Sequence, residues 1–196
     1  MEIRLATGED AAAIQAIYAP VVASTAISFE LEAPTVAEMA ARISAVLPSH
    51  PWLVLAGAGR VLGYAYAHPL APRAAYRWSV ETSVYVADAN RRGGMGLALY
   101  RSLLEVLRRQ GYRQALAGIA LPNPASVALH ESLGFRSVGV QRHVGWKLGA
   151  WHDVGWWQRG LAALTDPPAP PLAVDGLPAD TLAQALAFGT IGSIGT

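Results

Sequence analysis

A glycine-rich turn between a strand-like run and a long helical run constrains this chain more than any other feature. Residues 83–86 read Ser-Val-Tyr-Val, residues 91–96 read Arg-Arg-Gly-Gly-Met-Gly, and an apolar-periodic run follows. Glycine allows the backbone to adopt positive φ and to approach a ligand closely. The free N–H groups of a helix's first turn, together with the helix dipole, favour an anion. The pattern therefore predicts a phosphate-binding turn between a strand and a helix.

Two common phosphate loops do not match this turn. It lacks the Gly-Lys-Ser/Thr of nucleoside triphosphatases, and its glycine spacing differs from Gly-x-Gly-x-x-Gly. It reads Arg-x-x-Gly-x-Gly instead. Turns of this composition also simply connect a strand to a helix, so spacing alone leaves that alternative open.

Composition is typical of a globular protein of ordinary domain size. The chain has 196 residues, of which 53% are hydrophobic and 15% charged, with a formal net charge of +1. This length allows most of the apolar surface to be buried, and the low charge argues against a dedicated nucleic-acid surface. No cysteine occurs, which excludes disulfides, thiolate metal sites and cysteine nucleophiles. We expect no bound metal and no nucleic-acid partner.

The two ends of the chain carry different signals. Residues 1–4 lack the apolar core of a signal peptide, and no apolar run approaches the roughly 18 residues of a membrane span. We therefore expect a cytoplasmic protein without a membrane partner. Proline and alanine dominate residues 165–178, which predicts a linker-like tail followed by a weak helix at 181–188. We expect a domain at 1–164 and a tail at 165–196.

Hydrophobic periodicity between these ends predicts a mixed α/β chain. Thr35 and Glu38 have the spacing of a capping box, and Asn123 before proline is typical of a helix start. Apolar positions at i, i+3, i+4 and i+7 predict a helix that packs on a sheet. The expected strands are 2–7, 52–56, 60–68, 77–86, 112–121, 135–146 and 150–159, and the expected helices are 11–22, 35–47, 96–109 and 123–133.

Glu81 is the first candidate for chemistry. It lies within a strand otherwise suited to a sheet interior, where desolvation raises the pKa of a carboxyl group. A raised pKa suits a general base near neutral pH. The alternative is an exposed edge position or a salt bridge to an arginine. His130, on the predicted fourth helix, is either a second catalytic group or an ordinary half-buried histidine.

Two further segments have both a functional and a structural interpretation. The loop at 24–34 carries Phe29 and Glu30, which either form one wall of a substrate pocket or anchor a simple connector. Four tryptophans gather around the last predicted hairpin, and we interpret such a cluster as core or subunit packing rather than as a cofactor site. They are Trp146, Trp151, Trp156 and Trp157.

The order of these elements resembles the GNAT superfamily of acetyl-CoA-dependent N-acetyltransferases. Within it, residues 2–159 resemble the phosphinothricin and methionine-sulfone type, whereas the tail lies outside the match. The resemblance implies a mixed, mostly antiparallel twisted sheet flanked by helices and splayed at the acetyl-CoA site. It is carried by residues 75–81 (Ala-Tyr-Arg-Trp-Ser-Val-Glu), 83–86, the arginine-glycine loop, 121–135 and 149–159.

The same resemblance implies roles for individual residues. Glu81 and His130 match catalytic positions, and Arg73 and Tyr76 match positions that contact the amino-acid substrate. The herbicide-resistance enzymes have a basic residue where this chain has Ala71, which argues against phosphinothricin as the best substrate. The implied acetyl-CoA contacts are Val84, Tyr85, Val86, Arg91, Arg92, Gly93, Gly94, Met95, Gly96, Leu97, Asn123 and Ser126.

Together these features predict an enzyme that transfers acetyl from acetyl-CoA to a small amino-acid-like amine by direct attack. Glu81 removes a proton from the amine, and His130 assists it or protonates the departing thiolate. The aromatic hairpin and the resemblance imply a homodimer. A non-catalytic acyl-CoA sensor and a protein or peptide acetyltransferase are the alternatives. The presence of both Glu81 and His130 favours the enzyme over the sensor, because binding the coenzyme alone needs neither residue.

Overall fold

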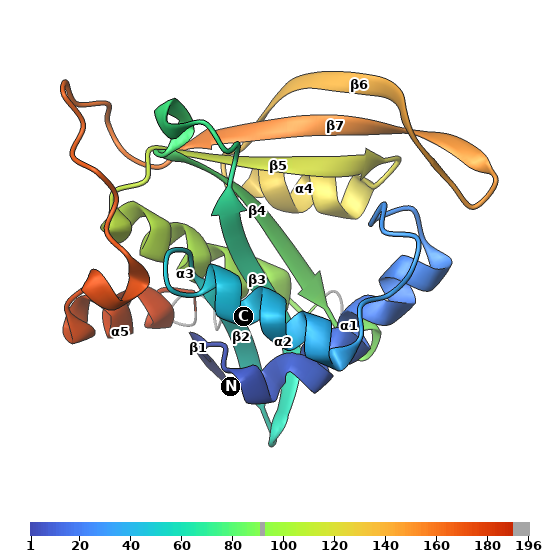
Figure 1. The fold of residues 1–196 in the computed structure, drawn as a ribbon, viewed down its shortest axis with the longest axis horizontal. Helices are drawn as coiled ribbons and strands as arrows, with labels where there is room; N and C mark the ends of the chain where they lie inside the picture. Colours follow the sequence, from blue (N-terminus) through green and yellow to red (C-terminus); the bar gives the residue numbers. More distant parts are fainter. Residues whose placement is uncertain (91–92, 190–196) are drawn as a thin grey trace.

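A single mixed sheet forms the centre of the molecule (Figure 1). The computed structural model describes residues 1–90 and 93–189, and within them seven strands take the order β1-β2-β3-β4-β5-β7-β6. Neighbouring strands are antiparallel except β4 and β5, which are parallel. The predicted mixed, mostly antiparallel sheet is thus confirmed. The strands are β1 (Glu2–Leu5), β2 (Trp52–Gly57), β3 (Arg60–Pro69), β4 (Ser79–Val86), β5 (Gln114–Leu121), β6 (Arg136–Lys147) and β7 (Ala150–Gly160).

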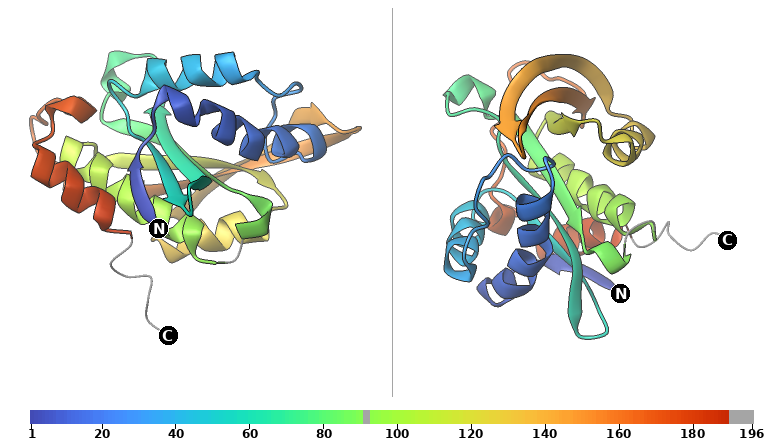
Figure 2. Two further views of the ribbon diagram at one scale, coloured as in Figure 1. Left: turned by 90° about the horizontal axis from the view of Figure 1, so that it is seen from below. Right: turned by 90° about the vertical axis from the view of Figure 1, so that its right-hand side faces the viewer.

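Helices cover both faces of the sheet (Figure 2). Helices α1 (Ala11–Ser24) and α2 (Val36–Val46) lie on one face, while α3 (Met95–Gln110) and α4 (Pro124–Ser132) lie on the other, with α5 (Ala179–Ala187) beside α3. All five were expected within a few residues of these bounds. Among the described residues, no helix combines the length and the apolar character needed to cross a membrane.

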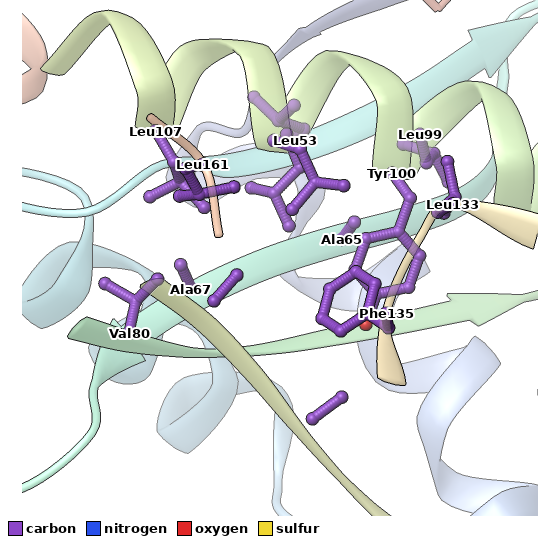
Figure 3. Packing of buried hydrophobic residues seen from close by; sticks show 14 of the residues in the cluster. Leu53, Ala65, Ala67, Val80, Leu99, Tyr100, Leu107, Leu133, Phe135 and Leu161 are labelled. Atoms are coloured by element: carbon purple, nitrogen blue, oxygen red, sulfur yellow. The ribbon is translucent and has the colours of Figure 1, made fainter. Parts of the chain in front are cut away.

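The larger core lies between α3 and the sheet (Figure 3). Leu99, Leu103 and Leu107 of α3 have no exposed surface and pack against small and branched strand residues such as Ala65 and Val80. The predicted apolar stripe of this helix is confirmed. Burial of such side chains contributes roughly 1.5–3 kcal/mol each, so this contact fixes where α3 begins relative to β4.

Two predicted helix caps form as expected. The Thr35 hydroxyl accepts from the amide of Glu38 at 3.2 Å, and the Glu38 carboxylate accepts from the amide of Thr35 at 2.7 Å. At α4, Asn123 Oδ1 accepts from the Ser126 amide at 3.1 Å. Each cap contributes about 1 kcal/mol, and the second fixes the start of the helix that carries His130.

The tail differs from the linker-like segment that its composition predicts. Val174 and Leu177 are buried, and the Gln110 side chain donates to the Leu172 carbonyl at 2.8 Å. The indole N–H of Trp78 donates to the Ala169 carbonyl at 2.8 Å. Apolar residues of the tail, which show no period in the sequence, pack against Val106 of α3. A backbone carbonyl of the tail also accepts from the buried side-chain amide of Gln110. The tail therefore packs as an additional layer over α3.

The β6–β7 hairpin also differs in part from its predicted packing role. Trp157 is buried in the core, but Trp146 and Trp151 are 56% and 59% exposed, with ring centroids 5.5 Å apart. Strand β6 is the edge of the sheet, so its outer residues have no covering layer in the described part of one chain. The tryptophan cluster is thus divided between core and surface.

Candidate active site

A gap opens between β4 and β5 where their pairing stops. Ser79, Val80 and Glu81 pair with Gln114 to Leu116, and beyond this point the two strands diverge, as Figure 1 shows. The Thr82 hydroxyl donates to the Leu116 carbonyl at 3.0 Å and makes the last link across the opening. The sheet is therefore splayed beyond Glu81, as the resemblance implies.

Backbone groups of β4 point into this gap. The Trp78 carbonyl accepts from the Arg113 amide on the β5 side, whereas the Ala87 amide donates to Leu62 on the β3 side. Backbone groups of successive residues in a strand point to opposite edges. The peptide groups of Val84 and Val86 therefore face the gap, while those of Tyr85 face β3. A ligand in the gap meets amide and carbonyl groups of the two valines.

The gap continues as a cleft between β4, β5, α3 and α4. Its walls include residues 82–85 of β4 and 117–120 of β5, with Asn123 and Ser126 at the start of α4. Tyr100, His130 and Ile27 complete it. Val84, Tyr85, Asn123, Ser126 and His130, which the sequence places far apart, thus share one cleft.

The glycine turn leads into α3 beside this cleft. Gly94 has φ of +74°, the left-handed region that favours glycine, and it directly precedes Met95. In the described part of the chain, no acceptor receives the amides of Met95, Gly96 or Leu97. A Cβ on Gly96 would lie 3.7 Å from Val86, so the turn adjoins the end of β4.

Free amides at the positive end of a helix dipole favour an anion, so this helix start suits a phosphate group. Gly93, the first residue described after the break, is exposed. Arg91 and Arg92, which we predicted as phosphate contacts, lie outside the described residues.

Glu81 lies on the other face of the sheet from the cleft's helices. Side chains alternate along β4: Val80 and Thr82 point to α3, whereas Tyr85 contacts Tyr18 of α1 at 5.1 Å between ring centroids. Glu81 therefore points to the α1–α2 face. Burial raises the pKa of its carboxyl group, and the neighbouring His68 partly opposes this rise. Its Oε2 lies 3.9 Å from His68 Nε2.

His130 is buried and fully hydrogen-bonded. Its Nδ1 lies 2.7 Å from the Ser126 carbonyl oxygen, and its Nε2 lies 2.9 Å from the Tyr100 hydroxyl oxygen. Its ring packs edge-on against Tyr100 and Phe135. Burial lowers the pKa of His130, so the neutral ring prevails at neutral pH. Glu81 and His130 thus flank the gap from opposite faces.

The loop at 24–34 holds its predicted residues through structural contacts. Glu30 accepts from the Tyr18 hydroxyl at 2.9 Å and forms an ion pair with Arg42 at 2.7 Å, which lowers the pKa of its carboxyl group. The ring of Phe29 occupies the space that a side chain at Gly145 would need. Neither residue lines the cleft; Ile27, two positions earlier than Phe29, does.

Arg73 and Tyr76 lie outside the cleft of a single chain. Arg73 precedes the short 3₁₀ turn Ala74–Tyr76 in the β3–β4 connection and is exposed. Tyr76 is exposed as well. Arg73 borders a separate cavity with Ala71 and Tyr112. The structure therefore groups most of the predicted acetyl-CoA and catalytic residues but leaves these two at the surface.

Two buried polar side chains at or near the cleft were not identified from the sequence. The helical periodicity of residues 96–109 marks Tyr100 only as a packing position, although a buried tyrosine hydroxyl usually has a specific partner. Lys147, the only lysine of the chain, carries no local signal. Its buried ammonium donates to the carbonyls of Val22 and Ser28 at 2.6 and 2.7 Å, which ties the hairpin to the loop carrying Ile27.

No metal centre accompanies this arrangement in the described chain, where no three His, Cys, Asp or Glu side chains gather as ligands. Its elements are a carboxylate of raised pKa, a buried neutral histidine, free strand amides and a helix N-terminus at one gap. This set can deprotonate an amine, hold an acyl group and bind a phosphate.

Comparisons with known proteins agree with this chemistry. Residues 3–156 match the acetyltransferase (GNAT) domain family. The chain is 41% identical to phosphinothricin N-acetyltransferase of Streptomyces viridochromogenes, over 89% of this chain and 93% of that protein. It is 36% identical to the L-methionine sulfoximine/L-methionine sulfone acetyltransferase of Salmonella typhimurium, over 82% and 95%.

A solved structure shares the fold. The phosphinothricin acetyltransferase of Sinorhizobium meliloti, in complex with acetyl-CoA, superimposes with a TM-score of 0.81 and 35% sequence identity. The match covers 88% of this chain and 97% of that one. By sequence and fold, the chain belongs to the GNAT family of acetyl-CoA-dependent N-acetyltransferases.

Proposed function

We propose that this enzyme acetylates the α-amine of a small amino-acid analogue, with methionine sulfone, methionine sulfoximine and phosphinothricin as candidate substrates. The observation that carries the proposal is the placement of Glu81 and His130 on opposite sides of the gap between β4 and β5. The relatives named above act on these same compounds. Acetylation of phosphinothricin or sulfoximine in the cytoplasm would also confer resistance to them.

Glu81 prepares the nucleophile in this proposal. The α-amine of an amino acid is mostly protonated at neutral pH, and only its neutral form can attack a thioester. A carboxylate with a raised pKa removes that proton efficiently, directly or through a water. The neutral amine then attacks the acetyl carbonyl. No covalent enzyme intermediate is needed, because positioning both substrates supplies much of the acceleration.

Strand and helix amides hold acetyl-CoA. The peptide groups of Val84 and Val86 contact its pantetheine arm, and the Val86 amide stabilises the oxyanion of the tetrahedral intermediate. The helix start at residues 93–97, with Arg91 and Arg92, binds the pyrophosphate. The amide nitrogen of Asn123 is free to donate near the sulfur, since its Oδ1 caps α4. Ser126 lies beside it.

The amino-acid substrate is bound by residues outside the cleft of one chain. Arg73 and Tyr76 present an exposed cation and a phenol, which suit a compact anionic ligand. Ala71 replaces a basic residue here, so we rank the methionine derivatives above phosphinothricin. The exposed face of β6 and β7, with Trp146 and Trp151, supports a homodimer.

Thiol release from acetyl-CoA tests the function. We expect release with the three amino-acid analogues that is lost in Glu81→Gln and strongly reduced in His130→Gln. Absence of release with every amine, despite acetyl-CoA binding, would identify a sensor instead. Preference for peptides over the amino-acid panel would identify a protein or peptide acetyltransferase.

Two glycine variants test the phosphate site separately. Gly94 and Gly134 both have positive φ and open space around a new Cβ, but Gly134 follows α4, away from the glycine turn. Both alanine variants should lose about 1 kcal/mol of stability. Only Gly94→Ala should weaken acetyl-CoA binding, measured by calorimetry. Equal weakening in both would assign the effect to general destabilisation.

A further inference from the structure

The C-terminal tail borders a second cavity, which shares no lining residue with the cleft. This cavity, which we call the tail cavity, has a volume of about 420 Å³ and lies between the β3–β4 connection, the start of β4, Tyr112 and residues 170–171. Small-molecule sites typically measure roughly 300–1,000 Å³. Pro170 and Pro171 lie beyond residues 3–156, the part of the chain that matches the family. The matched domain alone therefore does not form this cavity.

Hydrogen bonds hold the tail wall of the cavity in place on both sides of its two prolines. Before them, the Ala169 carbonyl accepts from the indole N–H of Trp78 at 2.8 Å. After them, the Leu172 amide donates to the Gln110 backbone carbonyl at 2.7 Å, and the Gln110 side chain donates to the Leu172 carbonyl at 2.8 Å. The same side chain donates to the Ser49 carbonyl at 3.0 Å. A cavity with fixed walls needs little ordering when a ligand binds.

Two buried side chains of the tail cavity carry polar atoms without a partner. Tyr112 is 5% exposed and His50 is 8% exposed, with 5.4 Å between their ring centroids. His50 Nδ1 lies 2.7 Å from the Ser49 hydroxyl oxygen, which leaves Nε2 as the free ring atom. Within residues 1–90 and 93–189, neither Nε2 nor the Tyr112 hydroxyl has a hydrogen-bond partner, and neither is fully enclosed by protein. Buried polar groups normally have partners, so both atoms suit a bound ligand.

The formal charges that line the tail cavity are all positive. Arg73 and Arg77 contribute to its wall, and no Asp or Glu of the described residues does. Arg77 Nε donates to the Ala74 carbonyl at 3.1 Å, and its guanidinium carbon lies 5.5 Å from the Trp78 ring centroid. These contacts orient the guanidinium and leave its terminal nitrogens for a ligand, and such a fork matches a carboxylate. An ammonium group would meet no carboxylate in this cavity.

The remaining walls of the tail cavity are mostly apolar. They consist of proline and alanine side chains, namely Pro69, Ala71, Pro72, Ala74, Pro170 and Pro171. Apolar walls favour a ligand whose body buries apolar surface. We propose that the tail cavity binds a small carboxylate that has a short apolar body and no ammonium group. Its carboxylate accepts from Arg77, from the Tyr112 hydroxyl and from His50 Nε2, while the Ser49 hydroxyl donates to Nδ1.

A matched set of ligands tests this chemistry by NMR in the absence of acetyl-CoA. Leucine has the carbon skeleton of 4-methylpentanoate with an added ammonium group, and 4-methylpentanamide lacks the charge. The loss of ring signals in His50→Gln and Tyr112→Phe assigns the two reporters. We expect 4-methylpentanoate to shift both sets of signals, and leucine and the amide to bind at least about tenfold more weakly. Inorganic phosphate, which has charge but no apolar body, should also bind more weakly.

Two variants test the contacts one at a time. Arg77→Met removes the cation, and Tyr112→Phe removes only a hydroxyl, so each should weaken 4-methylpentanoate binding about tenfold with little change in melting temperature. Arg136→Met, which removes an exposed cation on β6, is the control and should bind as wild type does. Arg73 stays unchanged in this series, because the proposed function gives it a separate role. Arg77 is exposed, so its variant remains informative if Tyr112→Phe unfolds.

The outcomes that contradict the site are distinct. Unchanged His50 and Tyr112 signals with 4-methylpentanoate would overturn it, and wild-type affinity in Arg77→Met would place the ligand elsewhere. Equal binding of leucine, or tighter binding of phosphate, would overturn the ligand class. None of these measurements involves acetyl transfer, so failure of the proposed function would leave the tail cavity to be judged on its own result.

Discussion

The two faces of the sheet hold their ionisable groups at the gap in opposite ways. On the α1–α2 face, the Glu81 side chain is 26% exposed, and the His68 ring lies 3.9 Å away, too far for a hydrogen bond. On the α3–α4 face, Tyr100 and His130 are sealed and bonded to each other at 2.9 Å. The open face can exchange protons with solvent, whereas the sealed face is closed to bulk water. One gap thus separates a solvent-accessible carboxylate from a buried tyrosine–histidine pair.

The largest effect should come from removing the Glu81 carboxylate. Glu81→Gln keeps the shape of the side chain but cannot accept the amine proton, so kcat/KM for the amine should fall about 10²–10⁴-fold. Thiol-release kinetics measure the loss. Glu105→Gln, which alters an ion-paired carboxylate on α3, should keep full activity. An active Glu81→Gln enzyme would mean that the open face has no catalytic proton acceptor.

The next effect concerns the loop that carries Ile27, one of the residues lining the cleft. Lys147→Met keeps the side-chain stem but leaves the Val22 and Ser28 carbonyls without their donor. We expect the free energy of unfolding to fall by about 1–3 kcal/mol and the KM for the amine to rise, because Ile27 is no longer held at the cleft. Chemical denaturation and steady-state kinetics measure both.

Arg142→Met provides the control on the same hairpin. The Arg142 side chain is largely exposed, and its ion pair with Asp153 is long, at 4.0 Å between Nη1 and Oδ2. Its loss should therefore change the free energy of unfolding by less than about 0.5 kcal/mol. Equal losses of stability in Lys147→Met and Arg142→Met would show that removing any cation destabilises the hairpin. The specific role of the Lys147 bonds to the loop would then be wrong.

A smaller effect should follow from removing the Thr82 hydroxyl on the α3–α4 face. Thr82→Val removes the last link across the gap, so the Leu116 carbonyl loses its donor and stability should fall by about 1 kcal/mol. The exposed Thr165→Val is the control. Denaturant midpoints of the two variants measure the difference; no difference would mean that water satisfies the carbonyl and that this face is less sealed than its burial indicates.

The smallest effect is a pH dependence of Glu81. Because burial raises its pKa above that of the unfolded chain, the folded state binds more protons between the two values. Wild-type stability is therefore lost as pH rises through that window. Glu81→Gln should be slightly more stable than wild type at neutral pH and equal to it below the unfolded pKa. A less stable variant at neutral pH would indicate that the ionised carboxylate is paired after all.

Local chemistry explains what the sequence could predict. The caps at Thr35 and Asn123, the apolar stripe of α3 and the turn at Gly94 depend on residues within a few positions of one another. A carboxylate inside an apolar strand marked Glu81 as a candidate, the resemblance matched both Glu81 and His130 to catalytic positions, and the structure places the two residues at one gap. Their catalytic roles remain predictions.

The features that the sequence did not reveal depend on contacts over long separations. The Tyr100 hydroxyl meets its histidine partner only when α4 brings His130 to it, 30 residues later. Lys147 bonds to carbonyls 125 and 119 residues earlier. Backbone acceptors have no side-chain signature, so no local pattern could identify these partners.

The packed tail has a consequence for the order of folding. Trp78 bonds to a residue 91 positions later, Gln110 to one 62 positions later, and Ser102 to one 84 positions later. During synthesis, at roughly 5–20 residues per second, the apolar strip of α3 around Val106 stays uncovered for several seconds after it leaves the ribosome. Packing of the tail on α3 ends this exposure. Until then, the uncovered strip is a surface that a chaperone could bind on the nascent chain.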